Sequence, residues 1–187
     1  MIYLDHASTC MPKPNFVLEA ITLLNENRTG SPYRSADQTI LIDNFVETTR
    51  KSLAKFLNIK KSENLAFTFN ATHGLNIIIK SVLKYGGHVV LSCFEHNAVL
   101  RPIHYMMHNG YDVNFSIINP EANGVFSSDA ITSAIRPYTK LIVWNHASNV
   151  TGQISPIDLI VRIAKDKKNF NTPRLFSNGR HVEYRRM

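Results

Sequence analysis

Three short polar runs hold the residues of this chain whose types could do chemistry, and each run follows an apolar segment. Residues 70–76 read NATHGLN, residues 95–102 read EHNAVLRP and residues 146–152 read HASNVTG. In α/β proteins, loops at the carboxyl ends of strands are where ligands bind and reactions take place. These three runs are therefore the candidate functional segments.

The first run is a candidate anion site. It lies between an expected strand and an expected helix, and the first N–H groups of a helix lack partners inside the helix, so they favour an anion. A phosphate bound there would meet the N–H groups from Ala71 to His73 and the Thr72 hydroxyl. The structural alternative is that Asn70 or Thr72 simply caps the helix. The local sequence leaves both interpretations open.

His96 and Asn149 are the candidates in the other two runs. An imidazole at a strand end can stack on a planar heteroaromatic ring or move protons, which makes His96 a candidate catalytic residue. The Asn149 amide can hydrogen-bond a phenolic or carboxylate oxygen, and Gly152 allows the backbone to approach a ligand closely. A structural loop histidine and a turn rich in Asn and Gly are the alternatives.

No metal site is expected. His104 and His108 are four residues apart on an expected helix, but no third ligand accompanies them. The two cysteines, Cys10 and Cys93, form no metal motif and fit a reducing compartment. We expect Cys93 to be a small buried residue rather than a reactive thiol.

Hydrophobic periodicity predicts alternating helices and strands around these runs. The expected helices cover residues 14–28, 36–57, 72–84, 98–108, 127–135 and 156–168, and the expected strands cover 65–69, 88–92, 113–118 and 141–144. This alternation predicts an α/β fold, a mostly parallel sheet flanked by helices. The sequence shows neither a signal-peptide pattern nor a membrane span, so a cytoplasmic protein without a membrane partner is expected.

Periodicity stops after residue 168, where another apolar strand should follow. Residues 165–187 hold seven basic and two acidic side chains, so +5 of the net charge of +7 lies there. A solvated tail, sequence foreign to the fold and a nucleic-acid contact are the three interpretations. A folded basic face or interleaved aromatic residues would be needed for the last one, so a nucleic-acid partner is not expected.

Four motifs, taken in order, resemble those of the cysteine desulfurases in the class V aminotransferase group. They are YLDHAST at residues 3–9, FTFNATHGLN at 67–76, and the runs at 95–102 and 146–152. The resemblance runs from residue 3 to about residue 168. His6 and Ser8 stand where the family more often has Asn and Ala, and residues 30–35 look like a weaker version of the family's substrate-side loop.

This resemblance implies a type I fold that binds pyridoxal 5'-phosphate (PLP). It implies that Ala71 and Thr72 contact the phosphate, that His96 stacks on the pyridine ring and that Asn149 lies near the ring hydroxyl. The intact relative would remove sulfur from an amino-acid substrate such as cysteine, and the family implies a homodimer.

Several residues of the family pattern have no counterpart in this sequence. They are the Asp that pairs with the pyridine nitrogen, the Schiff-base Lys, the Arg that binds the substrate carboxylate and the nucleophilic Cys. PLP chemistry needs the first two. We therefore expect residues 1–168 to be the N-terminal part of a PLP-binding domain and residues 169–187 a basic tail outside the family sequence. The expected protein is a truncated, inactive desulfurase-like chain with an unpaired sheet edge. The alternative is a non-catalytic binding or regulatory module that docks on a full-length relative.

Overall fold

The computed structural model describes residues 2–4, 6, 9–26, 40–166, 174–177 and 180–182. The chain divides into two compact units, Met1–Phe67 and Thr68–Met187. The predicted substrate-side loop at 30–35 and most of the basic tail lie outside the described residues. None of the helices in the described part combines the length and apolarity that a bilayer crossing requires.

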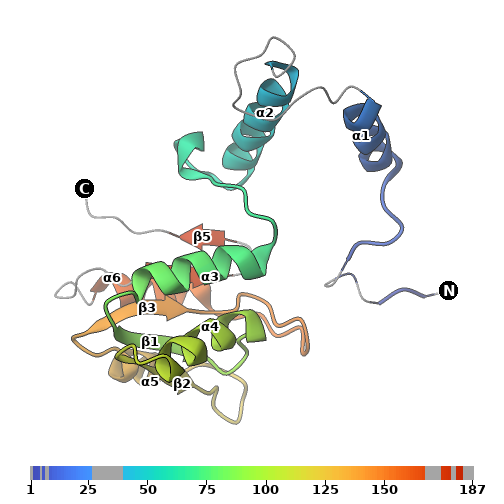
Figure 1. Ribbon diagram of the computed structural model, residues 1–187. Coiled ribbons are helices and arrows are strands. Elements are labelled where there is room, and N and C mark those ends of the chain that lie inside the picture. Colours follow the sequence, from blue (N-terminus) through green and yellow to red (C-terminus); the bar gives the residue numbers. More distant parts are fainter. Residues whose placement is uncertain are drawn as a thin grey trace. The chain divides into compact units, whose positions relative to one another are not determined.

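The first unit contains helices α1, Asn15–Glu26, and α2, Ile40–Phe56, and a short 3-10 helix, Ser62–Asn64 (Figure 1). The predicted strand at 65–69 is wrong. Residues 65–68 belong to no strand of the described chain, because a strand needs a hydrogen-bonding neighbour and none lies beside them. The Arg50 guanidinium instead donates to the Leu65 carbonyl and lies 5.1 Å from the centre of the Phe67 ring.

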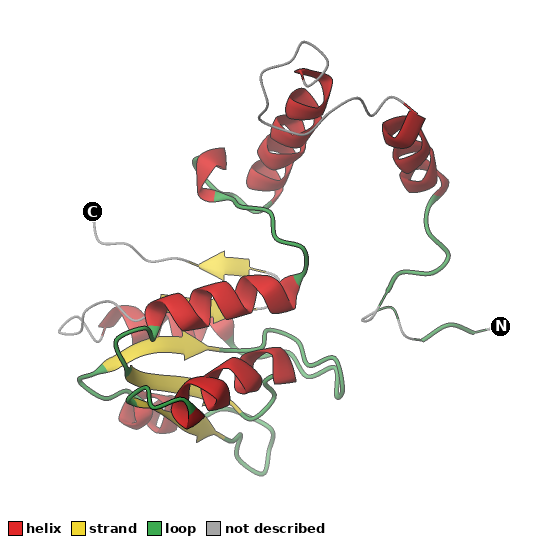
Figure 2. Cartoon of the chain, viewed as in Figure 1, coloured by secondary structure: helices red, strands yellow, loops and turns green. Residues whose placement is uncertain are grey.

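The second unit is built on one sheet, drawn as yellow arrows in Figure 2. Its strands are β1, Gly87–Ser92; β2, Val113–Ile118; β3, Thr139–Val143; β4, Arg174–Ser177; and β5, Arg180–Val182. They lie in the order β2-β1-β3-β4-β5, and every neighbouring pair is parallel except the antiparallel pair β4 and β5. The predicted α/β fold with a mostly parallel sheet is confirmed.

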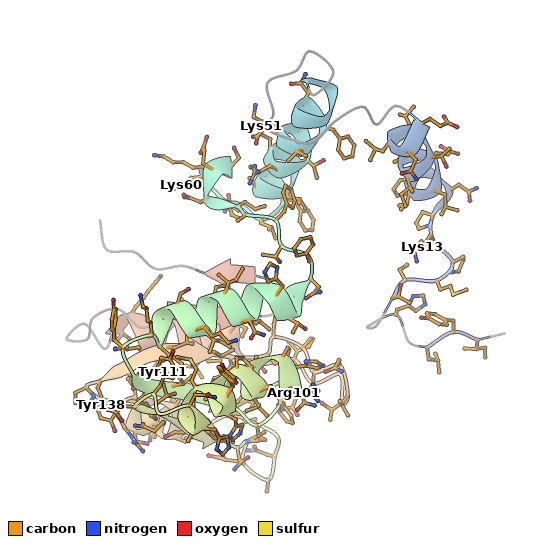
Figure 3. The ribbon with its side chains drawn as sticks, in the orientation of Figure 1. Lys13, Lys51, Lys60, Arg101, Tyr111 and Tyr138 are labelled. Atoms are coloured by element: carbon orange, nitrogen blue, oxygen red, sulfur yellow. The ribbon has the colours of Figure 1, made fainter. Side chains whose placement is uncertain are left out.

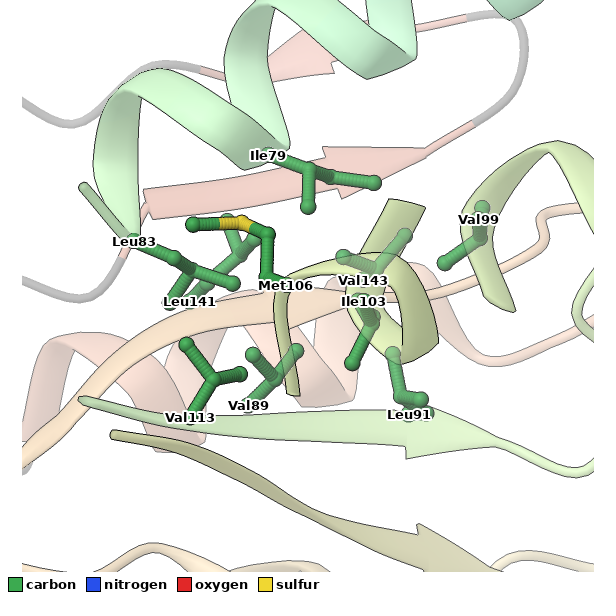
Figure 4. Close-up of a cluster of buried hydrophobic side chains, with 10 residues drawn as sticks. All are labelled: Ile79, Leu83, Val89, Leu91, Val99, Ile103, Met106, Val113, Leu141 and Val143. Atoms are coloured by element: carbon green, nitrogen blue, oxygen red, sulfur yellow. The ribbon is translucent and has the colours of Figure 1, made fainter. Parts of the chain in front are cut away.

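Helices cover both faces of this sheet. Successive residues of a strand point to opposite faces, so the apolar residues of one strand need cover on each side. Val89 and Leu91 of β1 face helices α3, Ala71–Val82, and α4, Asn97–His108, whereas Val90 faces α5, Ser128–Ala134, and α6, Ile157–Asp166. Figure 4 shows the first of the two buried clusters, formed by Ile79, Leu83, Val89, Leu91, Val99, Ile103, Met106, Val113, Leu141 and Val143. The unit therefore has an apolar core on each side of the sheet.

Strand β4 lies where the sequence indicated no further strand, so that expectation is wrong. Its pairing with β3 places Arg174 beside Leu141 and Phe176 beside Val143. The residues of β4 read RLFS and form no apolar run, so the strand is defined by its pairing with β3 and not by its own hydrophobic pattern.

The sheet has a topological switch point between β1 and β3. The chain leaves β1 through α4, which packs on one face, and leaves β3 through α6, which packs on the other. Neighbouring strands whose connections diverge in this way leave a crevice outside their carboxyl ends. The second and third polar runs follow these two strands.

Candidate functional site

The start of α3 combines a helix cap with free amides. The Asn70 side chain accepts a hydrogen bond from the His73 N–H at 2.8 Å, and the Gly74 N–H donates to the Asn70 carbonyl at 3.1 Å. Asn70 is therefore the cap. The N–H groups of Ala71 and Thr72 donate to no acceptor in the described part of the chain. The structural and anion-binding interpretations of this run are thus compatible.

His96 is the cap of α4. Its Nδ1 accepts a hydrogen bond from the Ala98 N–H at 3.0 Å, and its ring is exposed. A ring nitrogen that accepts carries no proton, so a neutral His96 carries its proton on Nε2. The cap thereby fixes the orientation and the tautomer of an imidazole whose faces remain open to a ligand.

Thr72 and His96 line the same open cleft between α3 and α4, which has a volume of about 500 Å³. The other lining residues are Asn76, Lys80, Asn97, Ala98, Arg101, Pro102 and Tyr105. Lys80 Nζ lies 4.8 Å from the centre of the Tyr105 ring, and Figure 3 marks Arg101 on α4. These lining residues include two cations and no carboxylate, so the cleft favours an anionic ligand.

Asn149 is exposed in the loop that follows β3 and does not line the cleft. The loop is held by two hydrogen bonds from the Val150 and Thr151 N–H groups to Ser148 Oγ, at 3.3 and 3.2 Å. It leaves the sheet at the same end as the starts of α3 and α4 (Figure 1). The structure therefore brings Thr72 and His96 together in the cleft and places Ala71 and Asn149 outside its lining.

Glu95 and Asn145 are polar residues of this region that sequence reasoning did not assign to the site. Glu95 Oε1 accepts hydrogen bonds from Ser92 Oγ at 2.5 Å and from the Asn145 N–H at 2.6 Å. Burial raises the pKa of the Glu95 carboxyl, and the hydrogen bonds from Ser92 and Asn145 oppose that shift. The one available signal was the position of Glu95 at the end of β1, directly before His96.

Cys93 is exposed, so the expectation of a buried residue is wrong. It follows the last residue of β1, where side chains leave the covered part of the sheet. Partial desolvation and the nearby Glu95 charge raise the pKa of the Cys93 thiol, although its own backbone opposes the shift. No cluster of three or more potential metal ligands occurs among the described residues.

Comparison with known proteins agrees with this fold and shows the family of the chain. The family model for class-V aminotransferases matches residues 2–171, and the chain belongs to that family.

Within the family, the chain is similar to cysteine desulfurases. It is 31% identical over 173 residues to "Cysteine desulfurase IscS" of Vibrio vulnificus strain YJ016, an alignment that covers 89% of this chain and 42% of that protein. The chain thus spans about two fifths of the length of the curated relatives it matches.

Two solved structures share the fold. The structure titled "SspA in complex with cysteine" has a TM-score of 0.82 and 26% identity, over 95% of this chain and 50% of that one. A C-DES mutant with glycine covalently linked to its PLP cofactor has a TM-score of 0.72 and 22% identity, over 89% of this chain and 43% of that one.

Proposed function

We propose that this chain supplies the phosphate-binding and ring-stacking part of the PLP site of a cysteine desulfurase-like protein. The observation that carries the proposal is that Thr72 and His96, at the starts of two different helices, line one cleft. The family assignment supports it, as does the PLP cofactor named for the C-DES mutant.

The residues present fit the cofactor. A phosphate dianion needs N–H donors, and the free amides of Ala71 and Thr72 open a helix of 12 residues whose dipole favours an anion. An aromatic ring needs a flat surface, and the exposed His96 imidazole is held in place through its Nδ1. When bound, PLP supplies an electron sink for reactions at an amino acid.

Each residue has a definite task in this proposal. Ala71 and Thr72 donate their amide hydrogens, and Thr72 its hydroxyl, to the phosphate. His96 packs one face of its ring on the pyridine and keeps its proton on Nε2. The exposed Asn149 side chain forms no hydrogen bond in the described part of the chain, so its amide is available to the ring hydroxyl.

The proposed substrate is an amino acid such as cysteine, and the proposed assembly is a homodimer in the cytoplasm. The cysteine complex of SspA supports the substrate class. These 187 residues on their own are expected to give no turnover, because a Schiff-base lysine and an acid for the pyridine nitrogen cannot be placed among them.

A non-catalytic binding module that docks on a full-length relative is the second candidate function. The observation that favours it is the pair of buried clusters in the second unit, because a binding module requires a core of its own.

Titration of the purified chain with PLP, followed by absorbance and fluorescence, tests the main proposal. We expect saturable binding that His96→Ala weakens by about tenfold or more, the order expected for losing a stacked ring. The matched control is His104→Ala, which removes an exposed histidine of the same helix that does not line the cleft.

Two results would contradict the proposal: no binding at millimolar PLP, or equal weakening by both substitutions. The expected absence of turnover is checked by incubating the chain with cysteine, PLP and dithiothreitol, which reduces any sulfur removed from cysteine to sulfide, and measuring alanine and sulfide. Steady turnover would show that these residues suffice for catalysis.

A further inference from the structure

We infer that Glu95 is the positioning residue of the proposed site: its carboxyl group fixes the carboxyl end of β1 to that of β3, and so sets His96 and residues 146–152 relative to each other. The inference rests on the proposed function, which it deepens. Four observations carry it.

First, the Glu95 side chain continues the sheet where its backbone pairing stops. The last pair between β1 and β3 is Leu91 with Val143. Beyond it, the two donors to Glu95 Oε1 come from both sides of the crevice: Ser92 Oγ from β1 at 2.5 Å, and the N–H of Asn145, two residues after β3, at 2.6 Å. One carboxyl oxygen thus joins segments 50 residues apart in the chain.

Second, the connection is reciprocal. The Asn145 side-chain amide donates to the Phe94 carbonyl at 3.0 Å, so each segment both donates to and accepts from the other. Two bonds of opposite direction restrict sliding and rotation of the strand ends more than one bond would.

Third, the two donor residues are buried, and Glu95 is partly buried. Ser92 is 1% exposed and Asn145 is 2% exposed. A buried N–H or hydroxyl that loses its acceptor has no water to replace it. The arrangement in which Glu95 accepts from both donors is therefore favoured in free energy over one that leaves either donor without an acceptor.

Fourth, both connected segments lead directly into the site. His96 follows Glu95 in the chain and caps α4 through the Ala98 N–H. Asn145 precedes His146, whose carbonyl accepts from the Ser155 N–H at 2.8 Å and closes the loop that holds Asn149. A change in backbone angle at residue 95 or 145 would thus move a candidate site residue.

The geometry calls for an acceptor oxygen rather than for a charge. Both of these bonds reach Oε1, and burial raises the pKa of the carboxyl although its hydrogen bonds oppose that shift. A glutamine would present the same Oε1 to the same two donors. An aspartate is one methylene shorter and would not reach Ser92 and Asn145 together.

The experiment compares Glu95→Asp with Glu95→Gln by NMR and by PLP titration of the full chain, below the melting temperature. We expect Glu95→Asp to shift the Asn145 amide proton upfield, to displace the resonances of His96 and residues 146–152, and to weaken PLP binding by about 5- to 20-fold, the range of one or two lost hydrogen bonds. Glu95→Gln should keep the Asn145 shift and bind PLP within about threefold of the parent chain. Glu121→Asp is the matched control, because Glu121 is exposed and its side chain lies outside the cleft.

The outcomes separate this inference from the proposed function. Absence of PLP binding by the parent chain would contradict the proposed function, while the NMR shifts would still report on Glu95. Unchanged resonances at His96 and residues 146–152 in Glu95→Asp, or displaced ones in Glu95→Gln, would overturn the inference. If Glu95→Asp does not fold, Ser92→Ala takes its place, because it removes the Ser92 hydroxyl donor. We expect Ser92→Ala to shift the same resonances in the same direction by a smaller amount. Unchanged resonances of His96 and residues 146–152 in Ser92→Ala would overturn the inference equally.

Discussion

Helices α1 and α4 have the same length of 12 residues but very different surroundings. Helix α4 buries Ala98, Val99, Pro102, Ile103 and Met106, whereas α1 buries no residue. Large apolar side chains of α1, including Phe16, Ile21 and Leu23, are exposed. An amphipathic pattern therefore predicts a helix without telling what its apolar face packs against.

This difference bears on how each helix is stabilised. A 12-residue helix is marginal in water, and in proteins most helical stability comes from packing of the apolar face. Packing against the sheet supplies that stability for α4. We expect α1, by contrast, to make little contribution to the unfolding free energy of this chain.

The largest expected effect comes from making the same substitution in both helices. Ile103 is 0% exposed and Ile21 is 47% exposed. Ile103→Ala should lower the free energy of unfolding by about 2 to 5 kcal/mol, because it removes buried methyl groups and leaves a cavity. Ile21→Ala should change it by less than about 0.5 kcal/mol. Urea denaturation of the two variants measures both values, and similar losses would mean that α1 packs as tightly as α4.

The pH dependence of the second unit offers a smaller effect. His88 is fully buried between Thr139 Oγ1, 2.8 Å from Nδ1, and Ser116 Oγ, 3.0 Å from Nε2. Burial, and to a lesser extent the positive charge of Arg136, lower the pKa of His88 from 6.5 to about 4. The unfolded chain therefore binds the proton first as the pH falls, so stability decreases between pH 6.5 and 4, by at most about 3 kcal/mol.

Chemical denaturation at pH 7 and pH 4.5 measures this loss, and His88→Gln provides the comparison. The variant lacks a titrating ring at the position, so its stability should fall less over the same interval. Equal slopes for the two proteins would show that His88 does not carry the pH dependence.

The smallest expected effect on the free energy of unfolding comes from substitutions at the starts of α3, which is packed, and α1, which is exposed. Asn70 caps α3 through the His73 N–H, so Asn70→Ala should cost about 1 kcal/mol of unfolding free energy. Asn15 is exposed at the start of α1, and Asn15→Ala should stay within about 0.5 kcal/mol of the parent chain. Thermal melting compares the two, and a larger loss at Asn15 would reverse the ranking of the helices.

The hydrophobic pattern predicted correctly those helices and strands whose apolar face packs against a neighbouring element of the fold. The strand at 113–118 was predicted with its observed bounds, and α4 to within one residue. The segment at 65–69 has an equally suitable alternation but no neighbouring strand among the described residues. Pairing is a property of two segments, so one segment alone cannot predict it.

The candidate site was predictable to a similar extent. The types and strand-end positions of Thr72 and His96 indicated ligand contacts, and the structure places both in one cleft. The contact between Glu95 and Asn145 could not be predicted, because it joins residues 50 positions apart and depends on burial at a crevice that the strand order creates. The assignment of residues 169–187 to a basic tail outside the family sequence stays a prediction.

The strand order also has a consequence during protein synthesis. Strand β1 is complete at Ser92, but its neighbours begin at Val113 and Thr139. While the ribosome makes the intervening residues, the apolar run Val89-Val90-Leu91 has both backbone edges unpaired. This internal strand of the sheet is therefore open to non-native pairing until both of its neighbours have been made.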